Sequence, residues 1–257
     1  MPNELLWVIM LLGNFAVILV LYRAFGPVGL IAWMAVSGIL ANIQVVKTIE
    51  IFGLTATLGN IVYASSFLAT DILSDKYGKG PARVSVFTGF TTLIAGTLIM
   101  SLALVFEPAG SDSTQGALET IFTVLPRITL ASVAAYLVSQ LHDVWAFQFW
   151  KQRFPGLRGL WIRNNLSTMV SQLVDTVIFT TIAFAGVFPL TIFLEIALTT
   201  YVLKWLVAAL DTPFVYIANS ITPGTLGQVF VSAVSGGESS GVSRGRQGSQ
   251  GSENFHE

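Results

Sequence analysis

Long apolar segments dominate this sequence and decide what it can fold into. A helix needs about 20 mostly apolar residues to cross the hydrocarbon layer of a bilayer. Only 11% of the residues are charged and the mean hydropathy is +0.72, a balance that a water-soluble domain would not keep in solution. We therefore predict an all-α, polytopic integral membrane protein with about seven transmembrane helices, located in the cell (cytoplasmic) membrane. The predicted spans are residues 5–24, 28–46, 54–73, 84–106, 121–149, 166–187 and 190–210.

Basic residues fall on one side of these seven segments. Lysine and arginine accumulate in cytoplasmic loops, and seven spans place ten of the 13 lysines and arginines on the same side. This asymmetry predicts an N-terminus outside and a C-terminus in the cytoplasm. The ten residues are Arg23, Lys76, Lys79, Arg83, Lys151, Arg153, Arg158, Arg163, Arg244 and Arg246.

Polar side chains inside the predicted spans indicate a function. A charged group at the bilayer centre costs about 3 kcal/mol, so it needs a partner or a water-lined cavity. In three spans such residues recur every three or four positions and therefore share one helical face. These faces carry Asn60, Tyr63, Phe67 and Asp71; Tyr136, Gln140, Asp143 and Phe147; and Asn165, Thr168, Gln172, Asp175 and Phe179.

The seventh span adds Glu195 and Lys204, and Asp211 follows it directly. Lys204 shares a face with Thr200 and Asp211, whereas Glu195 points the opposite way, so Lys204 is expected to reach a carboxylate on its own or a neighbouring helix. Together these groups predict a wet pocket for a polar small molecule.

Some of these residues have an equally good structural explanation. Asp71 lies close to a basic loop and could serve as an interfacial residue, and Arg127 follows Pro126 where its side chain could extend to water. Phe67 could be ordinary packing. The candidates that lie far from any loop are Asp143, Gln172, Asp175, Glu195 and Lys204.

Catalytic and nucleotide-binding motifs are absent from the sequence. Residues 78–80 read Gly-Lys-Gly but lack the remaining positions of a phosphate-binding loop, and there is no cysteine, HExxH or GxSxG. Asp175 and Thr176 lack the glycine that an aspartyl protease motif requires, which leaves an intramembrane enzyme as the weakest hypothesis. We predict no enzyme and no cofactor, and the net charge of −1 gives no indication of a nucleic-acid partner.

Four stretches carry a resemblance to a known family. ATDILSDKYG (69–78), SQLHDVWAFQFWKQR (139–153), STMVSQLVDTVIFTTIAF (167–184) and EIALTTYVLKW (195–205) resemble the motifs of the queuosine precursor transporter family, also called the vitamin uptake transporter family. The similarity covers most of residues 31–217. One departure is Asp75, where a glutamate is expected in many relatives. The resemblance implies substrate-binding roles for Asn42, Asp71, Gln140, Asp143, Gln172, Asp175, Glu195 and Lys204, to which the residue patterns add Phe67 and Arg127.

The resemblance also implies a substrate and an organisation. Members take up 7-cyano-7-deazaguanine and 7-aminomethyl-7-deazaguanine across the cytoplasmic membrane, which favours a secondary carrier or facilitator. Relative to six-span members, residues 1–27 look like an additional N-terminal transmembrane helix, 28–220 like the six-helix transporter core, and 221–257 like a cytoplasmic tail. The run of Gly, Ser, Gln and Arg beyond about residue 235 is expected to be disordered.

One alternative function and several partners stay open at this point. The chain could be a substrate-binding membrane subunit of an ATP-energised vitamin or nucleobase uptake complex, which would capture its ligand but not move it alone. The expected partners are a deazaguanine or another nucleobase-like molecule and membrane lipid, without nucleic acid. A homodimer is compatible with the sequence.

Overall fold

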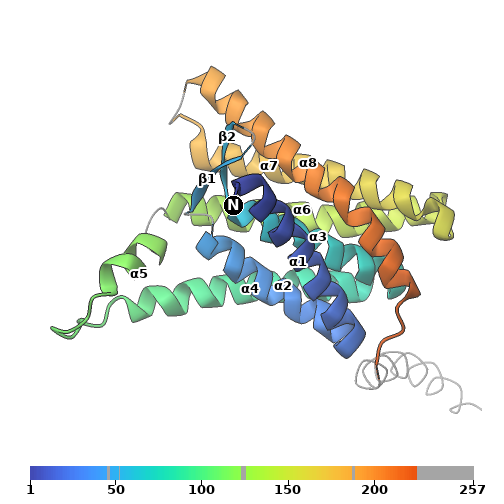
Figure 1. Cartoon of the computed structure of the whole chain (residues 1–257), viewed down its shortest axis with the longest axis horizontal. Helices are drawn as coiled ribbons and strands as arrows, with labels where there is room; N and C mark the ends of the chain where they lie inside the picture. The colour runs from blue at the N-terminus through green and yellow to red at the C-terminus, as the bar shows by residue number, and fades with distance from the viewer. Residues whose placement is uncertain (45–46, 52, 123–125, 187–188, 225–257) are drawn as a thin grey trace, which may run out of the picture.

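The computed structural model describes residues 1–44, 47–51, 53–122, 126–186 and 189–224, and it is built almost wholly from helices (Figure 1), which confirms the α-helical class. The predicted tail from residue 225 onward lies outside these ranges. In chain order the elements are α1 (Asn3–Phe25), α2 (Pro27–Gln44), β1 (Thr48–Ile51), β2 (Leu54–Thr57), α3 (Gly59–Lys76), α4 (Lys79–Ala103), α5 (Gln115–Phe122), α6 (Pro126–Arg153), the short 3-10 helix η1 (Leu157–Gly159), α7 (Leu160–Phe184) and α8 (Leu190–Ser220).

Five segments of the described chain are long and apolar enough to cross a membrane. They are α1, α2, α4, Leu157–Phe184 with α7, and Ala197–Ser220 within α8. α3, with 18 residues, and α6, with 28, reach the length of a span but carry more polar residues. The protein is thus multi-pass, while the crossing of the membrane by α3 and α6 and the orientation of the termini remain predictions.

The third and fifth predicted spans include residues that the structure assigns to other elements. The third was expected to begin at residue 54, but β1 and β2 pair as an antiparallel hairpin, in which Thr48 pairs with Thr57 and Ile51 with Leu54. The β-branched residues of the two strands, three threonines and two isoleucines, favour this structure, and Gly53 supplies a positive φ (74°) before β2. The predicted fifth span covers the end of α5 and most of α6, and Pro126 is the first residue of α6, where a proline costs no hydrogen bond.

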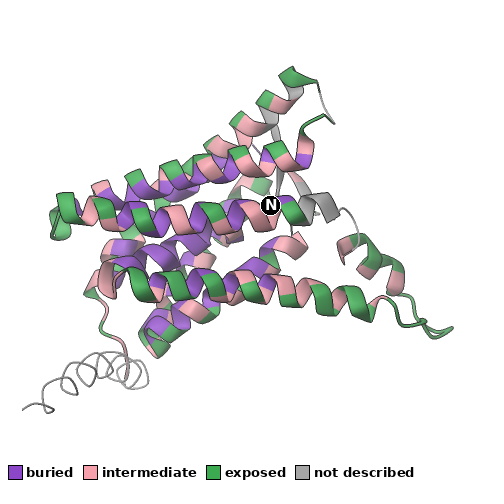
Figure 2. Ribbon diagram, turned by 180° about the vertical axis from the view of Figure 1, so that it is seen from behind, coloured by how far each residue is buried: buried purple, intermediate pink, exposed green. Residues whose placement is uncertain are grey.

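α3 is the central helix of the bundle. It packs against α1, α2, α4, α6 and α8, while α6 runs along α7 and α7 lies beside α8. Nearly every residue between Ile61 and Ser74 is buried, and Figure 2 shows the buried residues concentrated where the helices meet. This shielding is what allows α3 to carry several polar residues in the middle of the bundle.

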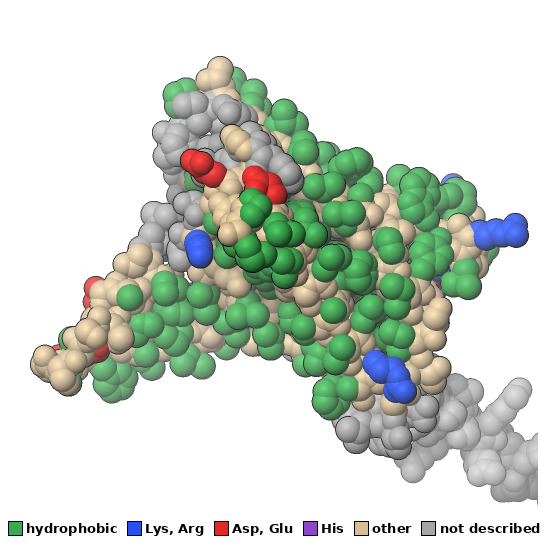
Figure 3. All heavy atoms as spheres, viewed as in Figure 1, with side chains coloured by type: hydrophobic (Ala, Val, Ile, Leu, Met, Phe, Trp, Pro, Cys, Tyr) green, Lys and Arg blue, Asp and Glu red, His purple; other side chains and the backbone are tan. Residues whose placement is uncertain are grey.

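The loops that carry the basic residues come together at one end of the bundle. Lys76 Nζ at the end of α3 donates to the carbonyl of Asn219 at the end of α8 (2.9 Å), and the amide of Gly224 donates to the carbonyl of Arg23 (2.7 Å). On the face drawn in Figure 3, hydrophobic side chains cover much of the surface, and charged side chains are few. The structure therefore places the ends of α1, α3 and α8 at one end of the bundle, which we call the basic end, while Arg244 and Arg246 lie outside the described residues.

Candidate functional site

Polar side chains of α3, α6, α7 and α8 meet at three heights in the bundle. At each height every one of the four helices contributes one residue. On α3, α6 and α7 the first and third heights are 12 residues apart, which corresponds to about 18 Å along a helix. Level 1 is Tyr63, Ser139, Asp175 and Lys204; level 2 is Asp71, Asp143, Thr168 and Asp211; level 3, at the basic end, is Asp75, Lys151, Arg163 and Asn219.

Level 1 is built around an ion pair in the interior. Lys204 of α8 bonds to Asp175 of α7, so the expected carboxylate partner of Lys204 lies on a neighbouring helix. Tyr63 Oη and Ser139 Oγ (3.1 Å) donate to the other carboxylate oxygen of Asp175. The lysine nitrogen also lies 5.1 Å from the centre of the Tyr63 ring. Both charges are buried, with 4% and 2% of their side chains exposed, and each is compensated by the other.

Level 2 brings three carboxyl groups together without a cation. Asp71, Asp143 and Asp211 are fully buried and close enough to interact electrostatically. Thr168 Oγ1 donates to Asp71 (2.9 Å), and Asn164 Nδ2 donates to Asp211 (2.8 Å). Among the residues that the structure describes, neither oxygen of Asp143 has a hydrogen-bond partner, and no group of acids is arranged to hold a metal ion.

Two glutamines lie on the stripes between levels 1 and 2. Gln140 Nε2 donates to Ser66 Oγ (2.8 Å), and its Oε1 accepts from Thr70 Oγ1 (3.3 Å). Gln172 is fully buried, and neither polar atom of its amide has a partner within the described part of the chain. A buried amide without partners costs about 1–3 kcal/mol, which a polar ligand could recover.

A small pocket reaches level 1 from the side of the β-hairpin. Its lining includes Lys204 together with residues of α1, β1, α3 and α8. The lining residues are Trp7, Ile49, Asn60, Ile61, Leu203, Lys204 and Val207. Of the four residues of level 1, Lys204 lines this pocket, on the side of the bundle that carries the hairpin.

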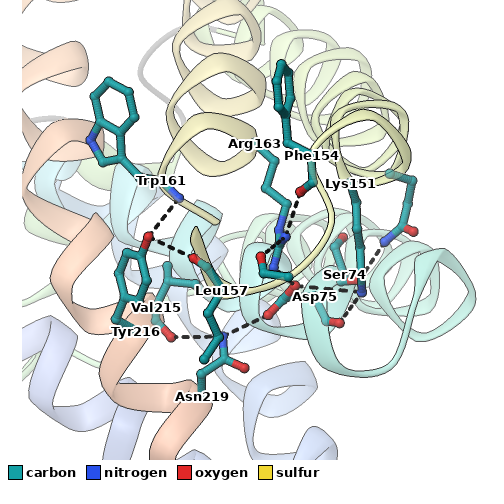
Figure 4. Close-up of polar contacts among 12 residues, drawn as sticks. Ser74, Asp75, Lys151, Phe154, Leu157, Trp161, Arg163, Val215, Tyr216 and Asn219 are labelled. Carbon is teal, nitrogen blue, oxygen red and sulfur yellow. Dashed lines mark hydrogen bonds and ion pairs between the residues drawn. The ribbon is translucent and has the colours of Figure 1, made fainter. Parts of the chain in front are cut away.

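Level 3 ties the basic end of the four helices together. Arg163 of α7 donates to Asp75 of α3 (2.5 Å), Asn219 of α8 donates to its second oxygen (2.8 Å), and Lys151 of α6 lies 3.7 Å away (Figure 4). At this level, unlike at level 2, two cationic side chains lie beside the carboxylate.

The structure brings six of the ten predicted site residues to levels 1 and 2 or between them. Phe67, which is fully buried, also lies close by, with its ring 6.0 Å from that of Tyr63. Asn42 is half-buried on α2 and belongs to none of the levels. The side chains of Arg127 and Glu195 lie outside the described part of the structure. The six residues are Asp71, Gln140, Asp143, Gln172, Asp175 and Lys204.

Sequence reasoning left several members of the levels out of the candidate site. Tyr63 and Asp211 share helical faces with Phe67 and Lys204, and that spacing could have identified both. Other members had no such signal, because they were assigned to loops or carry small hydroxyl groups. These are Asp75, Ser139, Lys151, Arg163 and Asn219.

Comparison with known proteins gives a consistent family. The family model described as "Putative vitamin uptake transporter" matches residues 57–218. A "Probable queuosine precursor transporter" of Bacillus subtilis (strain 168) is 46% identical over 223 residues, which is 87% of this chain and 97% of that protein. The "Queuosine precursor transporter" of Escherichia coli (strain K12) is 30% identical over 171 residues, covering 65% of this chain and 74% of its relative.

No solved structure matches the chain. The family match extends from Thr57, the last residue of β2, to Ala218 in α8, and it includes every residue of the three levels except Asn219. The chain belongs to the vitamin uptake transporter family and is a multi-pass transporter of the cell membrane, not an enzyme.

Proposed function

We propose that this protein imports the queuosine precursors 7-cyano-7-deazaguanine and 7-aminomethyl-7-deazaguanine as a secondary carrier or facilitator. The names of the relatives support this substrate class. The observation that carries the proposal is level 1, where a buried carboxylate, a buried ammonium group and an aromatic ring lie side by side on Asp175, Lys204 and Tyr63.

A deazaguanine matches the charges of level 1. Its adjacent N–H donors can bond to a carboxylate in bidentate fashion, and its carbonyl can accept from an ammonium group. In the absence of ligand Asp175 and Lys204 satisfy each other; a bound ring would insert between them and take over both partners. The rings of Tyr63 and Phe67 offer stacking surfaces for the heterocycle.

The groups around level 2 would extend the site. Gln172 lies on the same face of α7 as Asp175 and Thr168, one turn from each, and its free amide can both donate to and accept from a heterocycle. Asp71, Asp143 and Gln140 line the next step toward the basic end. We propose all of these as substrate-binding residues. The roles of Asn42, Arg127 and Glu195 rest on the sequence alone.

Uptake into proteoliposomes that contain only this protein tests the proposal. The wild type should accumulate or equilibrate tritium-labelled 7-cyano-7-deazaguanine. Asp175→Asn and Lys204→Met should each lower initial uptake by about tenfold to a hundredfold, because a hydrogen bond to a charged group contributes about 1.5–3 kcal/mol. The control Trp205→Phe changes a ring that is 42% exposed on the outside of α8, and it should leave uptake unchanged.

Two results would contradict the proposal in different ways. Normal uptake by both charge variants would remove level 1 from the substrate site. Ligand that raises the melting temperature of the wild-type protein but is never transported would instead indicate a binding subunit that needs a separate energising complex.

A further inference from the structure

Asp75 is the point where four helices are joined at the basic end of the bundle. Figure 4 shows Arg163 and Asn219 reaching its two carboxylate oxygens from α7 and α8, with Lys151 of α6 to the right of Asp75. Only 6% of the Asp75 side chain and 3% of the Arg163 side chain are exposed. A single carboxylate thus holds together the ends of all four helices that form the three levels.

The same contacts hold the end of α3. The last carbonyl groups of a helix lack partners within the helix, and here neighbouring side chains supply them. Gln148 Nε2 donates to the carbonyl of Ser74 (2.5 Å), and Lys151 Nζ donates to the carbonyls of Ser74 (3.3 Å) and Asp75. α3 therefore cannot move away from α6 without losing these bonds together with those of the carboxylate.

Arg163 also holds the loop between α6 and α7 over this end. Its Nη1 donates to the carbonyls of Phe154 (3.1 Å) and Gly156 (2.8 Å), while its Nη2 bonds to Asp75. The hydroxyl group of Tyr216 in α8 donates to the carbonyl of Leu157 (3.1 Å) in the same loop. Release of Arg163 would free α7, the loop and α3 at the same time.

The end of the bundle near the hairpin therefore differs from the basic end. A pocket reaches Lys204 from the side of the hairpin, whereas a substrate that leaves level 1 toward the basic end has to pass level 3, about 18 Å further along α3. An ion pair suits a gate at that position, because it lies where the helices end and water can solvate both charges once they separate. The pair of level 1 lies deeper and has no such replacement.

We propose that Asp75, Arg163, Lys151 and Asn219 form the gate on the basic side of the transport path, and that this structure shows it closed. Opening separates Asp75 from Arg163 and lets the basic ends of α3 and α7 move apart. The gate rests on the proposed transport function, in which a substrate passes from level 1 to the basic end. Asp75 and Arg163 act as positioning residues that set which side the site faces.

The absence of cysteine from the sequence makes a direct test simple. A single reporter, Ser74→Cys, replaces a fully buried hydroxyl group that has no hydrogen-bond partner among the described residues, one position before Asp75. Its reaction with a membrane-impermeant maleimide is followed in right-side-out and inverted vesicles without any substrate. Asp75→Asn should raise the labelling rate at least about tenfold, and only in the vesicles that expose the basic end.

Two further variants keep the test decisive. Asn219→Ala removes one donor to Asp75 but keeps the backbone carbonyl that binds Lys76, so a smaller increase of a few fold is expected even if Asp75→Asn does not fold. The control Asp112→Asn makes the same chemical change in a fully exposed loop and should leave the rate unchanged.

An unchanged rate in both Asp75→Asn and Asn219→Ala would overturn the gate, and so would equal increases from both sides, which indicate a general loss of packing. Because no substrate is used, these outcomes are independent of whether deazaguanine uptake is found.

Discussion

Replacing Lys204 with methionine is the sharpest perturbation of level 1. The substitution keeps the unbranched stem of the side chain but removes the only cation bonded to Asp175 within the described residues. Loss of one member of a buried ion pair costs about 3–5 kcal/mol, because the remaining charge stays buried without compensation. Asp175 retains its bonds from Tyr63 and Ser139, so we expect the lower end of this range, about 3 kcal/mol.

A double-mutant cycle tests this reasoning. In Asp175→Asn/Lys204→Met neither charge remains, so the double variant should be more stable than Lys204→Met alone, with a coupling free energy of about 2 kcal/mol. Unfolding of the purified protein in detergent by heat or denaturant measures each corner of the cycle. Val202→Met, a change on the exposed side of the same helix, is the control. Additive losses within about 0.5 kcal/mol would show that the pair is not coupled and would refute the electrostatic account.

Two further substitutions test level 2 and the helix packing. Asp143→Asn removes one of three buried, uncompensated carboxyl groups, so the melting temperature should not fall while uptake drops by roughly tenfold or more; a clear loss of stability would contradict this. Gly89→Ala would place a Cβ atom 2.1 Å from Tyr136 Oη and should cost about 1–3 kcal/mol in unfolding free energy, whereas at Gly96 the nearest atom is 3.5 Å away and alanine should be tolerated. Equal melting temperatures of the two alanine variants would contradict the packing argument.

Apolar length predicted most of the helices of this protein but not where they end. Hydropathy measures the part of a helix that lies in hydrocarbon, while the helix itself continues into polar residues. The sixth predicted span begins at residue 166, but α7 begins at Leu160. Arg163, assigned to a loop from the sequence, is therefore a buried residue within a helix, and its bond with Asp75 was missed.

Helical spacing identified which side chains share a face but not what each face meets. The stripes on α3, α6 and α7 predicted a common polar interior, and the structure places them together. Which residue of one helix lies level with which residue of the next depends on how far each helix is displaced along its neighbours. The pattern of a single helix does not encode that displacement. Lys204 is an example: its need for a carboxylate was predicted, but its choice of Asp175 follows from the antiparallel packing of α7 and α8.

The central position of α3 explains how a helix with so many polar groups remains in a membrane protein. It contributes Tyr63, Asp71 and Asp75 to the three levels, and none of these could face lipid without a large desolvation cost. α1 packs against α2, α3 and α8 and covers the bundle with an apolar face whose buried residues recur every three or four positions. These residues are Trp7, Leu11, Phe15, Ile18 and Tyr22.

α1 also contacts the bundle near both ends of the three levels. Near the hairpin, Trp7 lines the pocket beside Lys204. Near the basic end, Tyr22 Oη lies 3.4 Å from Tyr77 Oη, directly after α3, and its ring lies 5.8 Å from Lys76 Nζ. A helix that only anchored the chain would need neither contact. The first helix is therefore better understood as the apolar wall that lets the polar levels of α3 exist within a bilayer.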